Sequence, residues 1–212
     1  MSVIGIFQQQ PFRDRANIQG QYDWIVATLR STSPLSFGRY FCQDVPKKDK
    51  ESAADYEERT WRERLHITED GRVFIPPLAF KNCLDSAAKY LGKQIPGKGK
   101  ATYTKHFVSG VLVMNPLILP LKKADVKGEW RHVPADGVPG GTRRVMRCFP
   151  TIARWEGELE IQVLDDTVTR EVLAEHLVQT GQFIGVGSFR PQNRGIYGRF
   201  KLVSLKEKKR AA

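Results

Sequence analysis

The chain lacks the features that would place it in a membrane or in a secreted compartment. No apolar run approaches the about 20 residues that a helix needs to span a bilayer. The first residues have neither a basic start nor a long apolar core, so no signal peptide is predicted. The cysteines are odd in number and widely scattered (Cys42, Cys83 and Cys148), which favours free thiols over a disulfide framework. We therefore expect a cytoplasmic protein with no membrane partner.

The sequence also offers little from which to build a metal centre or a catalytic group. Its histidines have no metal-ligand spacing with the cysteines, and no Ser/His/Asp or paired-carboxylate arrangement can be recognised. His176 falls on a predicted helix and is expected to be structural. His66, His106 and His132 lie in or near basic segments, where a histidine can act as a general base toward an RNA 2′-hydroxyl or simply touch phosphate. We predict no metal, no cofactor and no catalytic residue.

Two glycine-bearing stretches resemble nucleotide-binding motifs but lack essential parts. Residues 92–99 have the glycine and lysine spacing of a phosphate loop, but the Ser/Thr that holds magnesium is missing and a helix precedes them. Gly185-x-Gly187 lacks the third glycine of a dinucleotide fingerprint and leads into a strand. The first stretch is better interpreted as a flexible basic loop that contacts a phosphate backbone. The lysines of this loop and its surroundings are Lys93, Lys98, Lys100 and Lys105.

Acidic side chains are in deficit. The 34 Lys and Arg residues outnumber 23 Asp and Glu residues, which gives a formal net charge of +11. Such a balance favours a polyanionic partner, with a basic but otherwise ordinary soluble protein as the alternative. The hydrophobic fraction of 41% is large enough for a real core, so wholesale disorder is not expected.

The segment from Phe183 to Phe200 carries the strongest functional signal. It combines four glycines, three arginines and four aromatic residues. Glycine permits close backbone approach, arginine binds phosphate, and aromatic faces accept unstacked bases. The segment therefore predicts contact with a single-stranded nucleic acid, RNA being favoured over DNA. Its candidate binding residues are Gly185, Gly187, Phe189, Arg190, Arg194, Tyr197 and Arg199.

Basic residues next to aromatic ones recur outside the predicted core elements. The clusters lie at 37–41, 61–62, 103–107 and 130–131. Several such clusters together favour a surface that stacks bases and holds phosphates. They add Arg39, Arg62 and Lys105 to the candidate residues, and the basic stretch 115–150 adds Arg143 and Arg144.

Hydrophobic periodicity predicts an α+β fold. Without its long excursions, the chain reads strand, helix, strand, strand, helix, strand, which is the ferredoxin-like, RRM-like βαββαβ order. The expected elements are strands at 22–30, 111–114, 158–164 and 197–205, a helix from Pro77 closed by Gly92, and a helix from Thr167 closed by Gly181. The expected organisation is an N-terminal arm at 1–19, a core at 20–205 with insertions at about 31–75 and 115–150, and a basic tail at 206–212.

This pattern resembles the RAMP superfamily, the RNA-binding backbone and processing subunits of CRISPR effector complexes. The resemblance rests on the strand-to-helix entry at 75–81 and on the Gly-rich segment at 185–200. Two features depart from the family pattern, because the spacing between the glycine pairs is longer and the last pair is Gly-x-x-Gly. A free-standing relative on the same core, such as a phage or mobile-element single-strand-binding protein, fits the pattern about equally.

The resemblance implies binding to the phosphate backbone largely without sequence preference. It also implies that Lys81 faces RNA and that an inserted β-hairpin, the thumb, wedges between bases. That hairpin is expected at either 60–75 or 115–150, with Glu69-Asp70-Gly71 as a turn signal in the first case. Subunits of this kind associate with themselves along the strand, into a filament or ring.

Two further function classes remain open at this point. One is a metal-independent endoribonuclease of the RAMP type that uses His66 or His106. The other is a phage single-stranded-DNA-binding or genome-associated structural protein with phage replication partners. Because no acid/base pair is evident, we favour a binding protein that is not an enzyme.

Overall fold

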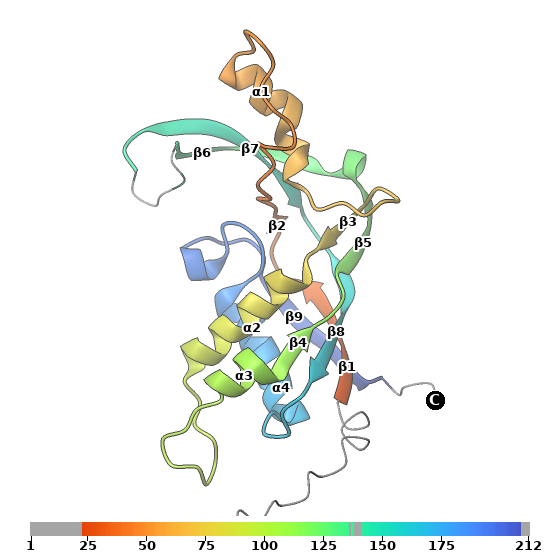
Figure 1. Ribbon diagram of the computed structural model, residues 1–212, viewed down its shortest axis with the longest axis vertical. Helices are drawn as coiled ribbons and strands as arrows, with labels where there is room; N and C mark the ends of the chain where they lie inside the picture. Colours follow the sequence, from red (N-terminus) through yellow and green to blue (C-terminus); the bar gives the residue numbers. More distant parts are fainter. Residues whose placement is uncertain (1–22, 136, 138–140, 209–212) are drawn as a thin grey trace, which may run out of the picture.

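The computed structural model describes residues 23–135, 137 and 141–208 of the chain, so the expected N-terminal arm at 1–19 lies outside the described residues. The core elements follow the predicted βαββαβ order (Figure 1). They are β1 (Asp23–Ser31), α2 (Pro77–Leu91), β4 (Val111–Val113), β8 (Glu156–Val163), α4 (Arg170–Gln179) and β9 (Phe200–Glu207). Their strands form one antiparallel sheet in the order β4-β8-β1-β9. The predicted α+β fold class is therefore confirmed.

The core lies between this sheet and the helices. Alternate residues of β1, namely Ile25, Ala27 and Leu29, are buried in this core, as the period-two pattern requires. Helix α2 presents Phe80 and Leu84 to the same core, and the helix ends at Gly92 as predicted. A short helix that the sequence pattern does not predict, α3 (Thr104–Gly110), also packs on α2. In the part of the chain that the structure describes, no helix has the length and apolarity to cross a membrane.

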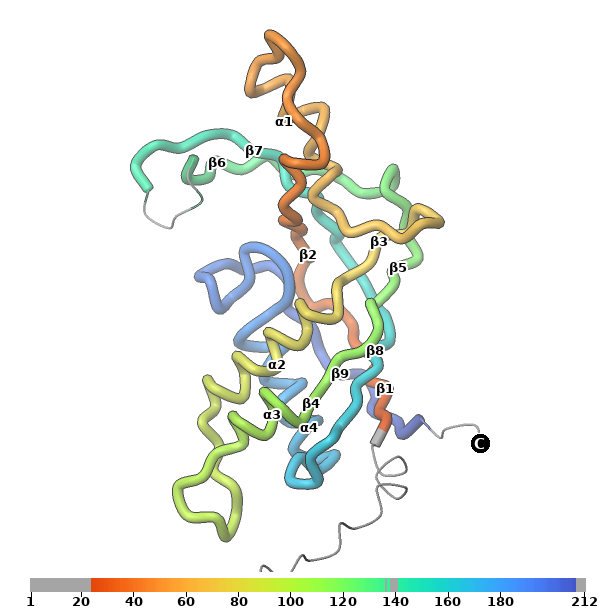
Figure 2. The backbone as a smooth tube through the Cα atoms, in the orientation of Figure 1, coloured from red at the N-terminus to blue at the C-terminus, as the bar shows by residue number. Residues whose placement is uncertain are grey.

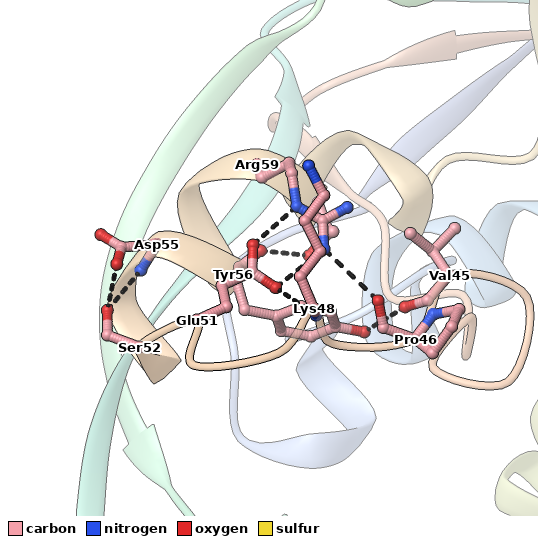
Figure 3. A network of polar contacts seen from close by, with 9 residues as sticks. Val45, Pro46, Lys48, Glu51, Ser52, Asp55, Tyr56 and Arg59 are labelled. Atoms are coloured by element: carbon pink, nitrogen blue, oxygen red, sulfur yellow. Dashed lines mark hydrogen bonds and ion pairs between the residues drawn. The ribbon is translucent and has the colours of Figure 1, made fainter.

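The first excursion, between β1 and α2, forms a knob that we define as residues 41–60. It contains α1 (Ala53–Thr60) and is followed by a 3-10 turn, η2 (Trp61–Arg64). Ser52 caps α1 through the backbone N–H of Asp55. Arg59 donates to both carboxylate oxygens of Glu51, at 2.7 and 2.9 Å, and these contacts close the knob on itself (Figure 3).

Residues 61–64 do not form the first strand of the hairpin expected at 60–75. They continue α1 into η2 instead. Arg64 lies seven residues, about two helical turns, after Glu57, and the two side chains form a buried ion pair with a distance of 2.9 Å. Only a single bridge between Ile67 and Val73 remains of the hairpin expected at 60–75. After it, β3 (Arg72–Ile75) pairs with β5 (Leu117–Lys122).

The second excursion contains the expected thumb-like hairpin. After β5 and the turn η3 (Lys123–Asp125), strands β6 (Lys127–Pro134) and β7 (Arg144–Ile152) pair antiparallel along their whole length. The base of β7 also pairs with β2 (Leu35–Ser36). The hairpin curves away from the central sheet beside the knob (Figure 1).

Two boundaries around the Gly-rich segment differ from the prediction. Helix α4 is capped by the hydroxyl of Thr169, which accepts from the N–H of Val172 at 3.4 Å. Thr167 lies in the turn before the helix, where its N–H donates to Asp165 at 2.9 Å. The helix does not stop at Gly181 but continues as a π-helical turn, η4 (Thr180–Ile184). Strand β9 begins at Phe200 rather than at 197, and it reaches Glu207, inside the expected tail.

Candidate nucleic-acid interface

A cleft of about 640 Å³ lies between the tip half of the β6–β7 hairpin, the segment 38–42 and the Gly-rich loop, which we define as residues 185–198. Figure 2 shows the Gly-rich loop, in blue, facing the hairpin, in teal. The loop includes a 3-10 turn, η5 (Pro191–Asn193). The lining residues are Gly38, Arg39, Tyr40, Phe41, Cys42, Arg64, Val133, Pro134, Gly137, Arg147, Phe149, Gly187, Ser188, Phe189, Arg190 and Asn193.

Among the described residues, four arginines and no carboxylate line this arginine cleft, so the lining charges that the structure describes are all positive. Arg39 pairs with Asp44 at the surface, at 2.5 Å, and Arg64 is neutralised by buried Glu57. Arg147 and Arg190 have no ion-pair partner among the described residues. A concave surface with excess positive charge raises the local concentration of anions such as phosphate groups.

The glycines of the Gly-rich loop are required by its internal packing. A Cβ atom on Gly195 would lie 1.7 Å from the carbonyl oxygen of Phe189, and one on Gly198 would lie 1.8 Å from that of Val186. Among the predicted residues, Gly187 lines the cleft. Gly185 is buried, and its carbonyl accepts a hydrogen bond from the thiol of Cys83. The glycines therefore shape the loop, and the charged and aromatic side chains between them contact the cleft.

Arg131 on β6 joins the hairpin to the Gly-rich loop. Its guanidinium lies 4.0 Å from the ring centre of Tyr197, 4.6 Å from that of Phe189 and 5.6 Å from that of Phe149. It also donates to Glu129 at 2.7 Å, and Tyr197 donates to the other oxygen of Glu129 at the same distance. The bond from Arg131, with a weaker one from Tyr197, lowers the pKa of Glu129 although burial opposes this shift. The aromatic rings that we predicted to stack on bases therefore contact Arg131.

The structure brings some predicted residues together in the cleft and places others on its surroundings. Arg39, Gly187, Phe189 and Arg190 line the cleft directly. Arg194 follows η5, and its side chain is exposed. The side chain of Arg199 is exposed as well, whereas its backbone carbonyl accepts hydrogen bonds from the N–H groups of residues 32 and 33. Arg143 and Arg144 are exposed on the β7 side of the hairpin. Arg62 lies over the ring of Trp61, 4.0 Å from its centre.

Four predicted lysines lie away from the cleft. The ammonium group of Lys81 donates to Asp85, at 2.5 Å, and to the carbonyls of Phe107 and Val108, which occupies all three of its N–H bonds. Lys98 and Lys100 are exposed on the 93–103 loop, and Lys105 begins α3 beside it. This loop lies at the opposite end of the long axis from the hairpin (Figure 2).

Sequence reasoning missed several residues that line the cleft. Tyr40 has 72% of its surface exposed there, and Arg64, Arg147 and Asn193 complete the lining. Tyr40 lies inside the aromatic cluster at 37–41, so a signal for it was present. Arg147 lies two residues before Phe149 on β7, and this period-two spacing places both on the cleft side of the hairpin.

None of the four histidines lines the cleft, and one of them, His66, lines a neighbouring cavity. His176 is buried and stacks on Phe107, as expected of a structural residue. His106 binds Asp165 at 2.6 Å, and exposed His132 lies on β6. His66 lines a cavity of about 220 Å³ that adjoins the arginine cleft. Burial, with a contribution from the charge of Arg39, lowers the pKa of His66. Among the described residues, no group of acidic, histidine or cysteine side chains is arranged to hold a metal ion.

Comparison with known proteins places the fold. No family model matches the chain, and no curated protein matches it by sequence. Its structure is similar to a chain of the type III-B Cmr-beta bound to cognate target RNA, with 10% sequence identity and a TM-score of 0.51. The match covers 92% of this chain and 63% of that chain, so the protein spans less than two thirds of its length. Cmr6 from Pyrococcus furiosus also matches, with 13% identity over 86% of this chain and 99% of that chain, and a TM-score of 0.46. The predicted RAMP resemblance is thereby confirmed at the level of the fold.

Proposed function

We propose that the protein binds single-stranded RNA in the arginine cleft, through the phosphate backbone and largely without sequence preference. The observation that supports this most directly is a cleft that four arginines line, with no carboxylate among its described lining residues. Its volume lies within the range of pockets that enclose a small organic ligand, roughly 300–1,000 Å³, so it has room for a short stretch of single strand. RNA is favoured over DNA because the similar Cmr-beta chain comes from an RNA-bound assembly.

Exposed Tyr40 is the aromatic residue of the cleft best placed to stack on a base. Phe189 and Phe149 present only part of their surfaces, because they contact each other and Arg131. Stacking tolerates any base, and arginine contacts to phosphate carry no sequence information. Both contacts are consistent with binding that does not depend on sequence.

Self-association along the strand, within a CRISPR-type assembly, extends this proposal. The 93–103 loop, which carries Lys98 and Lys100, lies at the other end of the long axis from the β6–β7 hairpin, and the hairpin forms one wall of the cleft (Figure 2). A strand held in the cleft of one copy would then meet the lysine-bearing end of the next copy. Electron microscopy with and without a long RNA tests this extension, and a strict monomer on long RNA would contradict it.

The binding proposal is tested by fluorescence anisotropy with single-stranded RNA, single-stranded DNA and duplex of equal length, at several salt concentrations. Arg147→Ala and Arg190→Ala should each weaken RNA binding and lower the slope of log K against log salt by roughly 0.7. Arg154→Ala is the matched control, because Arg154 is exposed, has no ion pair among the described residues and lies outside the cleft. Equal effects of all three variants, or a preference for duplex, would refute the assignment.

One observation also supports the alternative of a metal-independent endoribonuclease. His66 shares its cavity with Arg39 and Arg190, and its lowered pKa keeps it neutral and able to accept a proton at pH 7. Cleavage of hairpin RNA in EDTA that disappears in His66→Ala would favour this enzyme. RNA that stays intact while it binds would favour the binding protein.

A further inference from the structure

The cavity beside the arginine cleft has the size and chemistry of a site for one small anion. Its volume is about 220 Å³, roughly a third of the cleft's 640 Å³. The two spaces share Gly38, Arg39, Gly187, Ser188 and Arg190, so a ligand can extend from one into the other. Buried Leu35, Phe37 and Ile75 form the inner wall. A space of this size holds one phosphate group, and it forms a side branch of the cleft that is too small for a strand to pass through.

Arg190 brings an uncompensated positive charge to this side branch. Its Nε atom is buried and has no hydrogen-bond partner among the described residues, and its guanidinium contacts Cys83 Sγ at 3.6 Å. Burial raises the pKa of that thiol to about 11, although the charge of Arg190 opposes the shift, so the thiol is neutral. The guanidinium is partly buried beside a neutral group, so an approaching anion would stabilise its charge.

Other groups around the side branch favour an anion as well. Arg39 uses two of its five N–H bonds, for Asp44 and for the carbonyl of Glu63, and the Asp44 pair is solvent-exposed. Helix α2 begins at this cavity with Pro76 and Ala79 in the lining, with no capping side chain and no acidic residue in its first turn. The positive end of the helix dipole adds to the potential there. No carboxylate is among the lining residues.

We infer that the side branch receives the terminal phosphomonoester of the RNA strand whose backbone lies in the arginine cleft. A terminal monoester carries a charge of about −1.5 to −2 and three acceptor oxygens, whereas an internal diester carries one charge and must continue in both directions. Arg39 and Arg190 bind the dianion, and Ser188 and His66 lie in the same wall to donate hydrogen bonds. This inference rests on the proposed binding function and specifies which end group the site recognises.

The test compares three RNAs of one sequence, which carry a 5′-phosphate, a 3′-phosphate or hydroxyls at both ends. In anisotropy titrations, the protein should bind one phosphorylated RNA at least about tenfold more tightly than the hydroxyl RNA, as charge-assisted hydrogen bonds predict. The preferred end identifies the source of the phosphate. Equal affinity for all three RNAs would overturn the inference and leave the binding function intact.

Two variants of α2 localise the effect. Ala79 lines the side branch but not the cleft, so Ala79→Leu should abolish the preference for the phosphorylated end and leave binding of the hydroxyl RNA within about twofold. Asn82→Leu is the matched control, because Asn82 is exposed on the same helix and lines neither space. A preference that survives Ala79→Leu would overturn the site assignment.

A second measurement keeps the inference testable if Ala79→Leu does not fold. The wild-type protein is titrated by calorimetry with uridine 5′-monophosphate, uridine 3′-monophosphate and uridine. These ligands carry no strand backbone, so the titration measures recognition of the terminal phosphate separately from RNA binding. Binding of a monophosphate but not of uridine supports the pocket even if no RNA binds, and that outcome would refute only the proposed RNA function. If neither monophosphate nor phosphorylated RNA binds better than its hydroxyl counterpart, the pocket assignment fails.

Discussion

Replacing Arg131 by methionine should loosen the hairpin from the Gly-rich loop and destabilise the protein. Methionine keeps an unbranched apolar side chain but removes the charge that contacts Tyr197 and Phe189. The change also removes the donors to Ser36 Oγ at 2.9 Å, Thr151 Oγ1 at 3.2 Å and Glu129 at 2.7 Å. We therefore expect lower stability together with weaker RNA binding, although Arg131 does not line the cleft.

The size of the loss follows from these contacts. Hydrogen bonds to a charged group contribute about 1.5–3 kcal/mol and each cation–π contact about 0.5–2 kcal/mol, but neighbouring contacts are not additive. The Arg131 Nε atom is buried without an acceptor, which already costs free energy in the native protein. We therefore expect the free energy of unfolding to fall by about 2–4 kcal/mol, a large part of the roughly 5–15 kcal/mol of a typical domain.

The assay is urea denaturation at neutral pH, with Arg154→Met as the control on an exposed arginine. A loss below about 0.5 kcal/mol, the usual range of surface substitutions, would refute the argument.

The pH dependence of stability gives a second test of the Arg131 contacts. The pKa of Glu129 is lowered in the folded protein, so its stabilising contribution is present above its unfolded pKa and is lost as pH falls through the folded pKa. The difference between wild type and variant should therefore shrink below about pH 4.

Three more substitutions test separate parts of the structure. Arg64→Met leaves the Glu57 carboxylate buried without its partner, so urea denaturation should show a loss of about 3–5 kcal/mol; a neutral effect would refute this role of the ion pair. Tyr40→Ala should weaken RNA binding by about 1–3 kcal/mol, whereas Tyr90→Ala, equally exposed but outside the cleft, should not. Gly195→Ala places a Cβ against a carbonyl oxygen and should both destabilise the loop and weaken RNA binding, and normal values of both would contradict the packing argument.

The core could be predicted because local periodicity determines it. The alternation in β1 and the 3.6-residue repeat of α2 are properties of short segments, and the packing of the core agrees with both. The hairpin predicted at 60–75 is wrong at residues 61–64 for the opposite reason. The conformation of this segment depends on the ion pair between Arg64 and Glu57, seven residues before it. The same carboxylate accepts a hydrogen bond from the backbone N–H of Cys148, on another strand, at 2.8 Å. A short segment carries no trace of such a contact.

The candidate site shows the same division between local and distant information. Arginines and glycines concentrated in one segment correctly drew attention to the Gly-rich loop as one wall of a cleft. The other walls come from 38–42 and from a hairpin far along the chain, and only folding brings them together. Lys81 illustrates the converse, because a basic residue at a motif position is fully occupied by protein acceptors.

The glycines of the loop acquire a different meaning in the structure. Glycine in a basic segment usually suggests a backbone that cradles a ligand, but Gly195 and Gly198 face the loop's own carbonyl oxygens. What they achieve is a compact turn that holds Arg190 at the wall between the cleft and its side branch. The same arginine therefore faces the strand backbone on one side and, in our inference, the strand end on the other. Its substitution should thus reduce both general RNA affinity and the preference for a terminal phosphate, whereas Arg147, which lines only the cleft, should affect the first alone.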